Sequence, residues 1–95
     1  MVHIGYEQIE VTNAVQTANA LTIPANATHC RLQAQDGNVN YTMDGVSDPS
    51  ASAGMILHAG LKPEEFEITD LRNIRFTKDA GAPKLNISYL AGRDV

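Results

Sequence analysis

Val39-Asn40-Tyr41-Thr42-Met43-Asp44-Gly45 is the stretch that decides the fold class. Apolar and polar residues alternate up to Met43, and the Asp-Gly pair then breaks the pattern. Because successive side chains of a strand point to opposite faces, this period of two predicts a half-buried β-strand. The Gly, Asp, Asn and Pro residues that interrupt the rest of the chain indicate turns between further short strands.

The same alternation recurs along nearly the whole chain. Turn signals, among them Asp36-Gly37 and residues 79–83, separate the segments, and helical periodicity does not exceed single turns. About eight short strands at this spacing favour an all-β fold, a single antiparallel β-sandwich domain over residues 1–95, with a jelly roll as one form of it. Residues 1–12 form either an N-terminal arm or the first strand. The expected strands are 4–12, 20–24, 29–35, 39–43, 55–57, 66–68, 73–77 and 84–90.

Composition narrows the function classes. With three Tyr, two Phe and no Trp, the core has to come from aliphatic residues, and Cys30, the single cysteine, is predicted to be a small buried hydrophobe. The net charge is −4 and the seven basic residues are dispersed, which argues against a nucleic-acid surface. No apolar run reaches the ~20 residues of a membrane span, and no signal peptide is evident, so we expect no membrane partner.

No constellation of residues indicates catalysis, a metal site or a cofactor, and we predict that the protein is not an enzyme. The three histidines share no ligand spacing, and the serines of the long loop lack a nucleophile elbow. The acidic residues are interpreted as turn formers and as a charged sheet edge. The residues considered are His3, His29 and His58; Ser47, Ser50 and Ser52; Asp36, Asp44, Asp48 and Asp70; and Glu64, Glu65 and Glu67.

Six motifs occur in an order that suggests a family. They are Ala20-Leu21-Thr22-Ile23-Pro24-Ala25-Asn26-Ala27, Val39-Asn40-Tyr41-Thr42-Met43-Asp44-Gly45, Pro49-Ser50-Ala51-Ser52-Ala53-Gly54, Leu57-His58-Ala59-Gly60, Leu71-Arg72-Asn73-Ile74-Arg75-Phe76 and Leu85-Asn86-Ile87-Ser88-Tyr89. With these motifs, the chain resembles over residues 20–89 the small β-sandwich virion proteins of tailed bacteriophages. One departure is that Val46-Ser47-Asp48 precedes Pro49, where that family's loop usually reads closer to Asp-Gly-x-x-Pro-Thr.

The resemblance implies a non-enzymatic structural role, as a capsid decoration or cement protein on the outer capsid surface. The expected partners are the major capsid protein or other virion proteins and further copies of the chain, with a trimer favoured. The expected location is the virion, after synthesis in the host cytoplasm. The segment 2–11 is the piece expected to reach a neighbour, because an extended arm can add a strand to an exposed sheet edge. Its candidate contact residues are Val2, Ile4, Tyr6, Ile9 and Val11.

Two alternatives stay open. One is a minor head–tail connector or tail component of the same particle. The other is a small carbohydrate-binding module, because Tyr41-Thr42-Met43-Asp44-Gly45 also resembles domains appended to glycan-degrading enzymes. Such modules stack sugars on exposed Trp or Tyr, whereas Tyr41 and Tyr89 are predicted to point inward.

Overall fold

The computed structural model describes residues 2–50 and 52–92. Within these residues, six strands form one antiparallel sheet in the order β1-β6-β3-β4, and β2 pairs with β6 while β5 pairs with β3. The antiparallel all-β prediction is therefore confirmed. The strands are β1 (Val2–Glu10), β2 (Gln16–Thr17), β3 (His29–Thr42), β4 (Met55–Leu57), β5 (Glu64–Glu67) and β6 (Arg75–Ala91), with a short 3-10 helix η1 (Ala18–Ala20) and one helical turn α1 (Ile68–Leu71).

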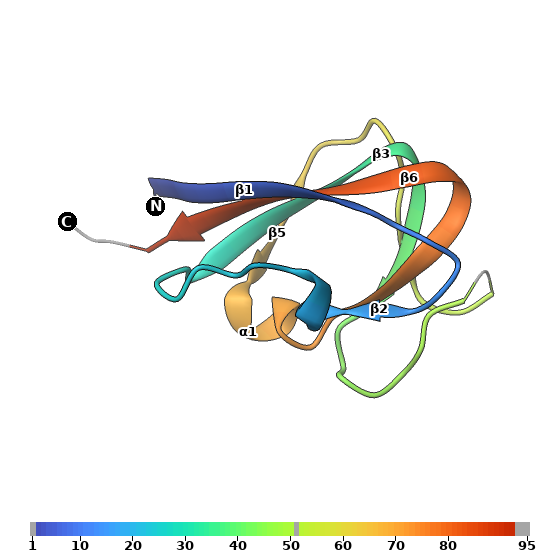
Figure 1. Ribbon diagram of the computed structural model, residues 1–95, viewed down its shortest axis with the longest axis horizontal. Helices are drawn as coiled ribbons and strands as arrows, with labels where there is room; N and C mark the ends of the chain where they lie inside the picture. Colours follow the sequence, from blue (N-terminus) through green and yellow to red (C-terminus); the bar gives the residue numbers. More distant parts are fainter. Residues whose placement is uncertain (1, 51, 93–95) are drawn as a thin grey trace.

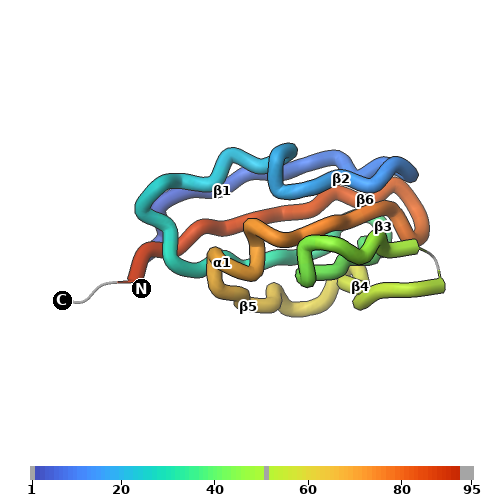
Figure 2. Tube along the Cα trace, turned by 90° about the horizontal axis from the view of Figure 1, so that it is seen from below, coloured from blue at the N-terminus to red at the C-terminus, as the bar shows by residue number. Residues whose placement is uncertain are grey.

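Two long strands, β3 and β6, run through the whole sheet and bend in the middle (Figure 1). Residues 29–35 of β3 pair with 84–90 of β6, and residues 37–42 pair with 75–81, with shifts of register between Gln35 and Gly37 and between Asn38 and Val39. We call the part built from β1, β5, residues 29–35 and residues 84–91 the β1 half. The part built from β2, β4, residues 37–42 and residues 75–81 is the β4 half. Figure 2 shows β1 and β2 on one side of β6, and α1, β5 and β4 on the other.

One core lies inside the bend and is shared by both halves. Leu85, Ile87 and Tyr89 of β6 are buried, whereas Asn86 and Ser88 between them stay partly accessible, as period two requires. The rings of Tyr41 and Phe66 add an edge-to-face contact, with centroids 5.9 Å apart. The principal core residues are Cys30, Leu32, Ala34, Val39, Tyr41, Leu57, Ile68, Leu71, Ile74, Phe76, Leu85, Ile87 and Tyr89.

The two turns expected at Asp36-Gly37 and at residues 79–83 are not turns, and that prediction was wrong. Both lie within the long strands, where the ladder is interrupted by bulges. Asp36 and Gly81 have positive φ angles of 64° and 78°, and Gly37 is paired with Gly81. A hairpin would pair 29–35 with 39–43, but both stretches pair with β6 instead. These residues therefore bend a continuing strand, and four expected short strands become two long ones.

Two further segments differ from expectation. Residues 20–24 do not form a strand, because the chain turns through η1, closed by the bond from Leu21 N–H to Ala18 O (3.0 Å). Leu21 and Ile23 nevertheless pack on the core, as the alternation predicted. The strand expected at 66–68 is β5, which ends at Glu67, and the buried Ile68 begins α1.

Candidate functional site

Strand β1 lies at an edge of the sheet. It pairs with β6 over the register from Val2↔Ala91 to Glu10↔Lys84, with a bulge between His3 and Gly5. Among the described residues, no strand pairs with its other side. The segment 2–10 is thus the first strand of its own sheet, and one row of its backbone groups has no strand partner among the described residues.

The structure divides the five candidate contact residues of the N-terminal segment. Val2 and Tyr6 are 53% and 65% exposed. Ile4 and Ile9 pack against the core, and Val11 is buried in it. Val2 and Tyr6 are therefore the members of the set that are most accessible to a neighbour, and the prediction that this segment contacts a partner stays a prediction. The bulge after His3 changes which residues face outward, and the sequence pattern does not reveal it.

The outer face of the β1 half carries a network of polar side chains, which we call the polar face: Tyr6, Gln8, Gln35 and Asn86. Tyr6 Oη donates to Asn86 Oδ1 (2.9 Å), and Gln8 Nε2 donates to the same oxygen (2.8 Å). Asn86 Nδ2 donates to Gln35 Oε1 (3.0 Å), which also accepts from Gln8 Nε2 (3.3 Å). Three neighbouring strands, β1, β6 and β3, supply these groups, so the sheet itself fixes their spacing.

A shallow pocket of about 200 Å³, the Tyr6 pocket, adjoins this network. His3 Nδ1 lies 2.8 Å from Ser88 Oγ, and Gln33 Nε2 donates to Leu61 O (3.0 Å). Arg31 Nε donates to Glu65 Oε1 at 3.2 Å, a half-exposed ion pair that contributes little to stability. The pocket is lined by His3, Tyr6, Arg31, Gln33, Pro63, Asn86 and Ser88.

Two of the motifs that carry the family resemblance meet in the loop after β3. The Asp44 carboxylate accepts bonds from the Ser47 hydroxyl and from the backbone N–H of Ser47 and Val46, and these bonds lower the pKa of Asp44 to about 2. Arg75 of the Leu71–Phe76 motif then fastens the loop, donating to Asp48 Oδ1 (2.6 Å) and to Gly45 O (3.1 Å). The residues that depart from the family pattern thus make defined contacts in this loop.

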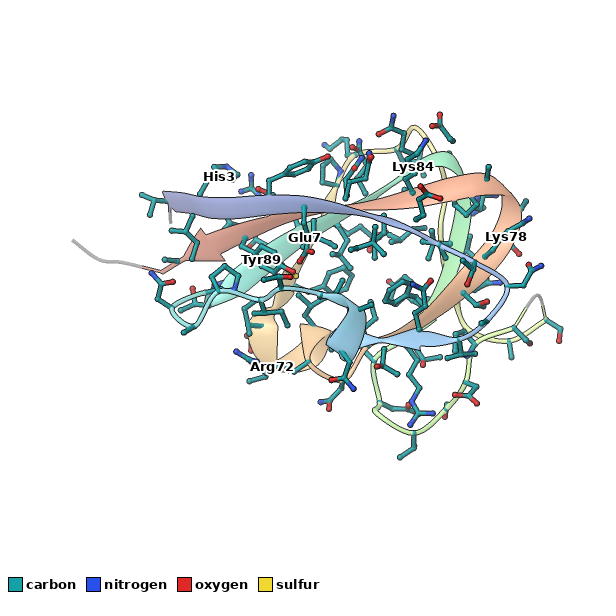
Figure 3. The ribbon with its side chains drawn as sticks, in the orientation of Figure 1. His3, Glu7, Arg72, Lys78, Lys84 and Tyr89 are labelled. Atoms are coloured by element: carbon teal, nitrogen blue, oxygen red, sulfur yellow. The ribbon has the colours of Figure 1, made fainter. Side chains whose placement is uncertain are left out.

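A second polar contact lies on the inner side of β1. Glu7 Oε2 accepts from Tyr89 Oη (2.5 Å) and from Thr22 N–H (2.7 Å), and Figure 3 shows Glu7 and Tyr89 pointing toward one another. Burial raises the pKa of Tyr89 above its ordinary value, and the bond to Glu7 adds to the effect. This contact ties β1, β6 and the segment after η1 together.

The reactive residue types lie apart. His3 is bonded to Ser88 and His29 to Thr28. Cys30 is fully buried, as predicted, and burial raises its pKa to about 12, so its thiolate is suppressed. The described residues hold no group of three or more His, Cys, Asp or Glu side chains placed to bind a metal. Over the same residues, no helix is long and apolar enough to cross a membrane.

Comparison with known proteins gave no assignment: no family model, no curated protein and no solved structure matched the chain.

Proposed function

We propose that this chain is a non-enzymatic structural component of a tailed-phage particle, a decoration or cement protein that binds the outer surface of the major capsid protein. The observation that carries the proposal is the ordered block of six motifs over residues 20–89. Two of these motifs support each other in space, because Arg75 bonds both Gly45 and Asp48. In this proposal the fold provides a scaffold for docking, and it performs no reaction.

The edge of β1 is the docking surface in this proposal. The side of β1 that has no strand partner among the described residues can pair with an edge strand of the capsid protein or of a second copy, and Val2 adds an exposed apolar side chain at its start. The chain acts as a homo-oligomer, with a trimer favoured, at the outside of the virion. On a symmetric lattice, several weak contacts of this kind combine through effective concentration.

Binding to phage heads tests the proposal. Heads prepared without this chain are incubated with the purified protein and sedimented. We expect wild-type protein to co-sediment and Val2→Glu to bind at least about tenfold more weakly, because it places a charge in an apolar contact. Val46→Glu is the matched control: Val46 is 75% exposed and lies in the loop after β3, at the far end of the molecule from the start of β1 (Figure 1).

Failure of the wild-type protein to bind the heads would overturn the proposal. Equal loss of head binding with Val2→Glu and Val46→Glu would show that the β1 edge is not the docking surface. The copy number on purified particles separates the subtypes, because a cement protein covers the whole capsid lattice, whereas a connector or tail component forms a single ring.

A further inference from the structure

The Tyr6 side chain is the most exposed aromatic ring on the outer face of the sheet, and it is held in place. It is 65% exposed, yet its hydroxyl is bonded to Asn86 on the neighbouring strand. Asn86 pairs with Gln8, two residues beyond Tyr6 along β1, so the Tyr6 hydroxyl reaches diagonally across the sheet. The ring therefore leans over the sheet surface and presents an open face at a fixed tilt. An aromatic face so held offers apolar contact area at low entropic cost.

The groups around this ring can both donate and accept hydrogen bonds. The Tyr6 pocket includes two side-chain amides, Gln33 and Asn86, and the hydroxyl of Ser88. Each already has one partner within the protein, which fixes its orientation: Gln33 to Leu61, Asn86 to the polar face and Ser88 to His3. A ligand rich in hydroxyl groups matches this mixture, because every hydroxyl is both a donor and an acceptor.

The pocket does not require a charged ligand, because its one permanently charged lining group, Arg31, is already paired with a carboxylate outside the pocket. Its described lining contains Arg31 and His3 as basic groups and no carboxylate, and Arg31 is already bonded to Glu65. Apolar contact is limited to the Tyr6 ring and Pro63, which is little for a peptide anchored by side chains. One apolar platform beside a row of amides fits a pyranose ring, whose C–H face is apolar and whose edge carries hydroxyls.

From these observations we infer that the Tyr6 pocket binds a neutral saccharide. One sugar ring stacks on the exposed face of Tyr6, and its hydroxyls bond to Asn86, Gln33 and Ser88. The pocket of about 200 Å³ is only partly enclosed, so it suits one ring of a surface chain of sugars. The pocket lies on the face of the sheet, whereas the proposed capsid contact lies on the edge of β1, so both can be occupied together. The inference goes beyond the structural role and does not depend on it.

Titration of the full chain with neutral oligosaccharides, followed by amide NMR, tests the inference. The probes are hexamers of glucose (α1,4 and β1,4), of N-acetylglucosamine, of mannose and of galactose, each up to about 10 mM, tenfold above the Kd of a weak millimolar ligand. We expect at least one probe to give saturable shifts confined to residues 3–8, 31–33 and 86–88. Tyr6→Ala is expected to weaken that binding at least about tenfold, and Tyr6→Phe less, because the platform survives without its bond to Asn86.

Met55→Ala is the matched control, because Met55 is 62% exposed and lies on β4, outside the pocket. It is expected to leave saccharide binding unchanged. Absence of saturable shifts with every probe would overturn the inference, as would shifts that Tyr6→Ala does not reduce. A peptide of the capsid protein is not expected to displace a bound saccharide. Tight binding of such a peptide to the same residues would count against the inference. Gln33→Ala, a pocket variant on β3 and outside the N-terminal segment, should leave head binding intact, so the saccharide site and the capsid contact can fail separately.

Discussion

The two faces of the β1 half use the same strands in opposite ways. On the inner face, Leu32, Leu85 and Ile87 are completely buried. On the outer face, the polar face residues Tyr6, Gln8, Gln35 and Asn86 bond to one another across the strands and remain in contact with solvent. This difference indicates that the inner face supplies the stability. The outer face is ordered by hydrogen bonds but is not part of the core. An outer face of this kind can serve binding, and each prediction below tests that division.

The largest expected difference is in thiol reactivity across one strand. Cys30 faces the core and Arg31, the next residue, faces solvent. In native protein near pH 8, the reaction of Cys30 with a thiol reagent requires unfolding, so we expect a rate at least about 1000-fold below that of an exposed thiol. The matched control is Arg31→Cys in a Cys30→Ala background. Comparable rates for the two cysteines would show that the inner face is open.

Truncation of a core side chain is expected to give the next largest effect. Leu32→Ala should lower the free energy of unfolding by about 2–5 kcal/mol, because it leaves a cavity between the strands. Tyr6→Ala on the outer face should change it by only about 0.5 kcal/mol. Denaturant unfolding measures both. If the Tyr6 variant lost as much as the Leu32 variant, the outer face would be part of the stabilising structure.

The bend that joins the two halves predicts a smaller loss. Gly81 has a φ of 78°, and a Cβ added there would lie 2.9 Å from Asp36 O on the partner strand. Gly60 has a similar φ of 83°, but nothing lies within 4 Å of the added Cβ. Gly60→Ala should therefore cost only the backbone strain, about 1 kcal/mol, and Gly81→Ala about 1–3 kcal/mol more. Equal denaturant midpoints for Gly81→Ala and Gly60→Ala would mean that β3 and β6 do not approach closely at the bend.

Tyr89→Phe removes the hydroxyl and is expected to give the smallest loss in the free energy of unfolding, about 1 kcal/mol near pH 7, because Glu7 still accepts from the Thr22 N–H. The pH dependence has a definite sign. The pKa of Tyr89 is raised in the folded state, so its contribution is complete below the ordinary pKa of about 10 and is lost as the pH rises above it. The pKa values of Cys30 and Tyr41 are also raised, so these groups change the stability with pH in the same direction. The quantity to measure is therefore the difference in the free energy of unfolding between wild type and Tyr89→Phe. If the free energies of unfolding of wild type and Tyr89→Phe ran parallel from pH 7 to 11, the burial of the Tyr89 phenol would be contradicted.

Much of the inner face could be predicted from the sequence. Period two identified Cys30, Leu32 and Ala34, and later Leu85, Ile87 and Tyr89, as inward residues, because alternation holds whether a strand is short or long. The continuity of β3 and β6 could not be predicted in this way. An Asp-Gly pair fits a hairpin turn and a bulge equally well, and only the pairing partner, β6 in both cases, decides between them.

The candidate site was harder to predict, for two physical reasons. The bulge between His3 and Gly5 turns Ile4 to the inner face and His3 to the outer face, against the alternation of residues 6–11, and a single sequence carries no signal for it. The polar face also combines residues separated by up to 80 positions, such as Tyr6 and Asn86. Their outward direction followed from the alternation of 29–35 and 84–90, but their proximity depends on the order β1-β6-β3, which the sequence leaves open.

The most direct test of the proposed role is the thermal stability of phage heads prepared without this chain, measured before and after the purified protein is added back. The proposal predicts that wild-type protein binds and raises the temperature at which the heads release their DNA. It predicts that Val2→Glu fails to do so and that Gln33→Ala, on β3, restores stability fully. Heads whose stability is unchanged by saturating wild-type protein, or purified particles that lack the chain, would contradict it.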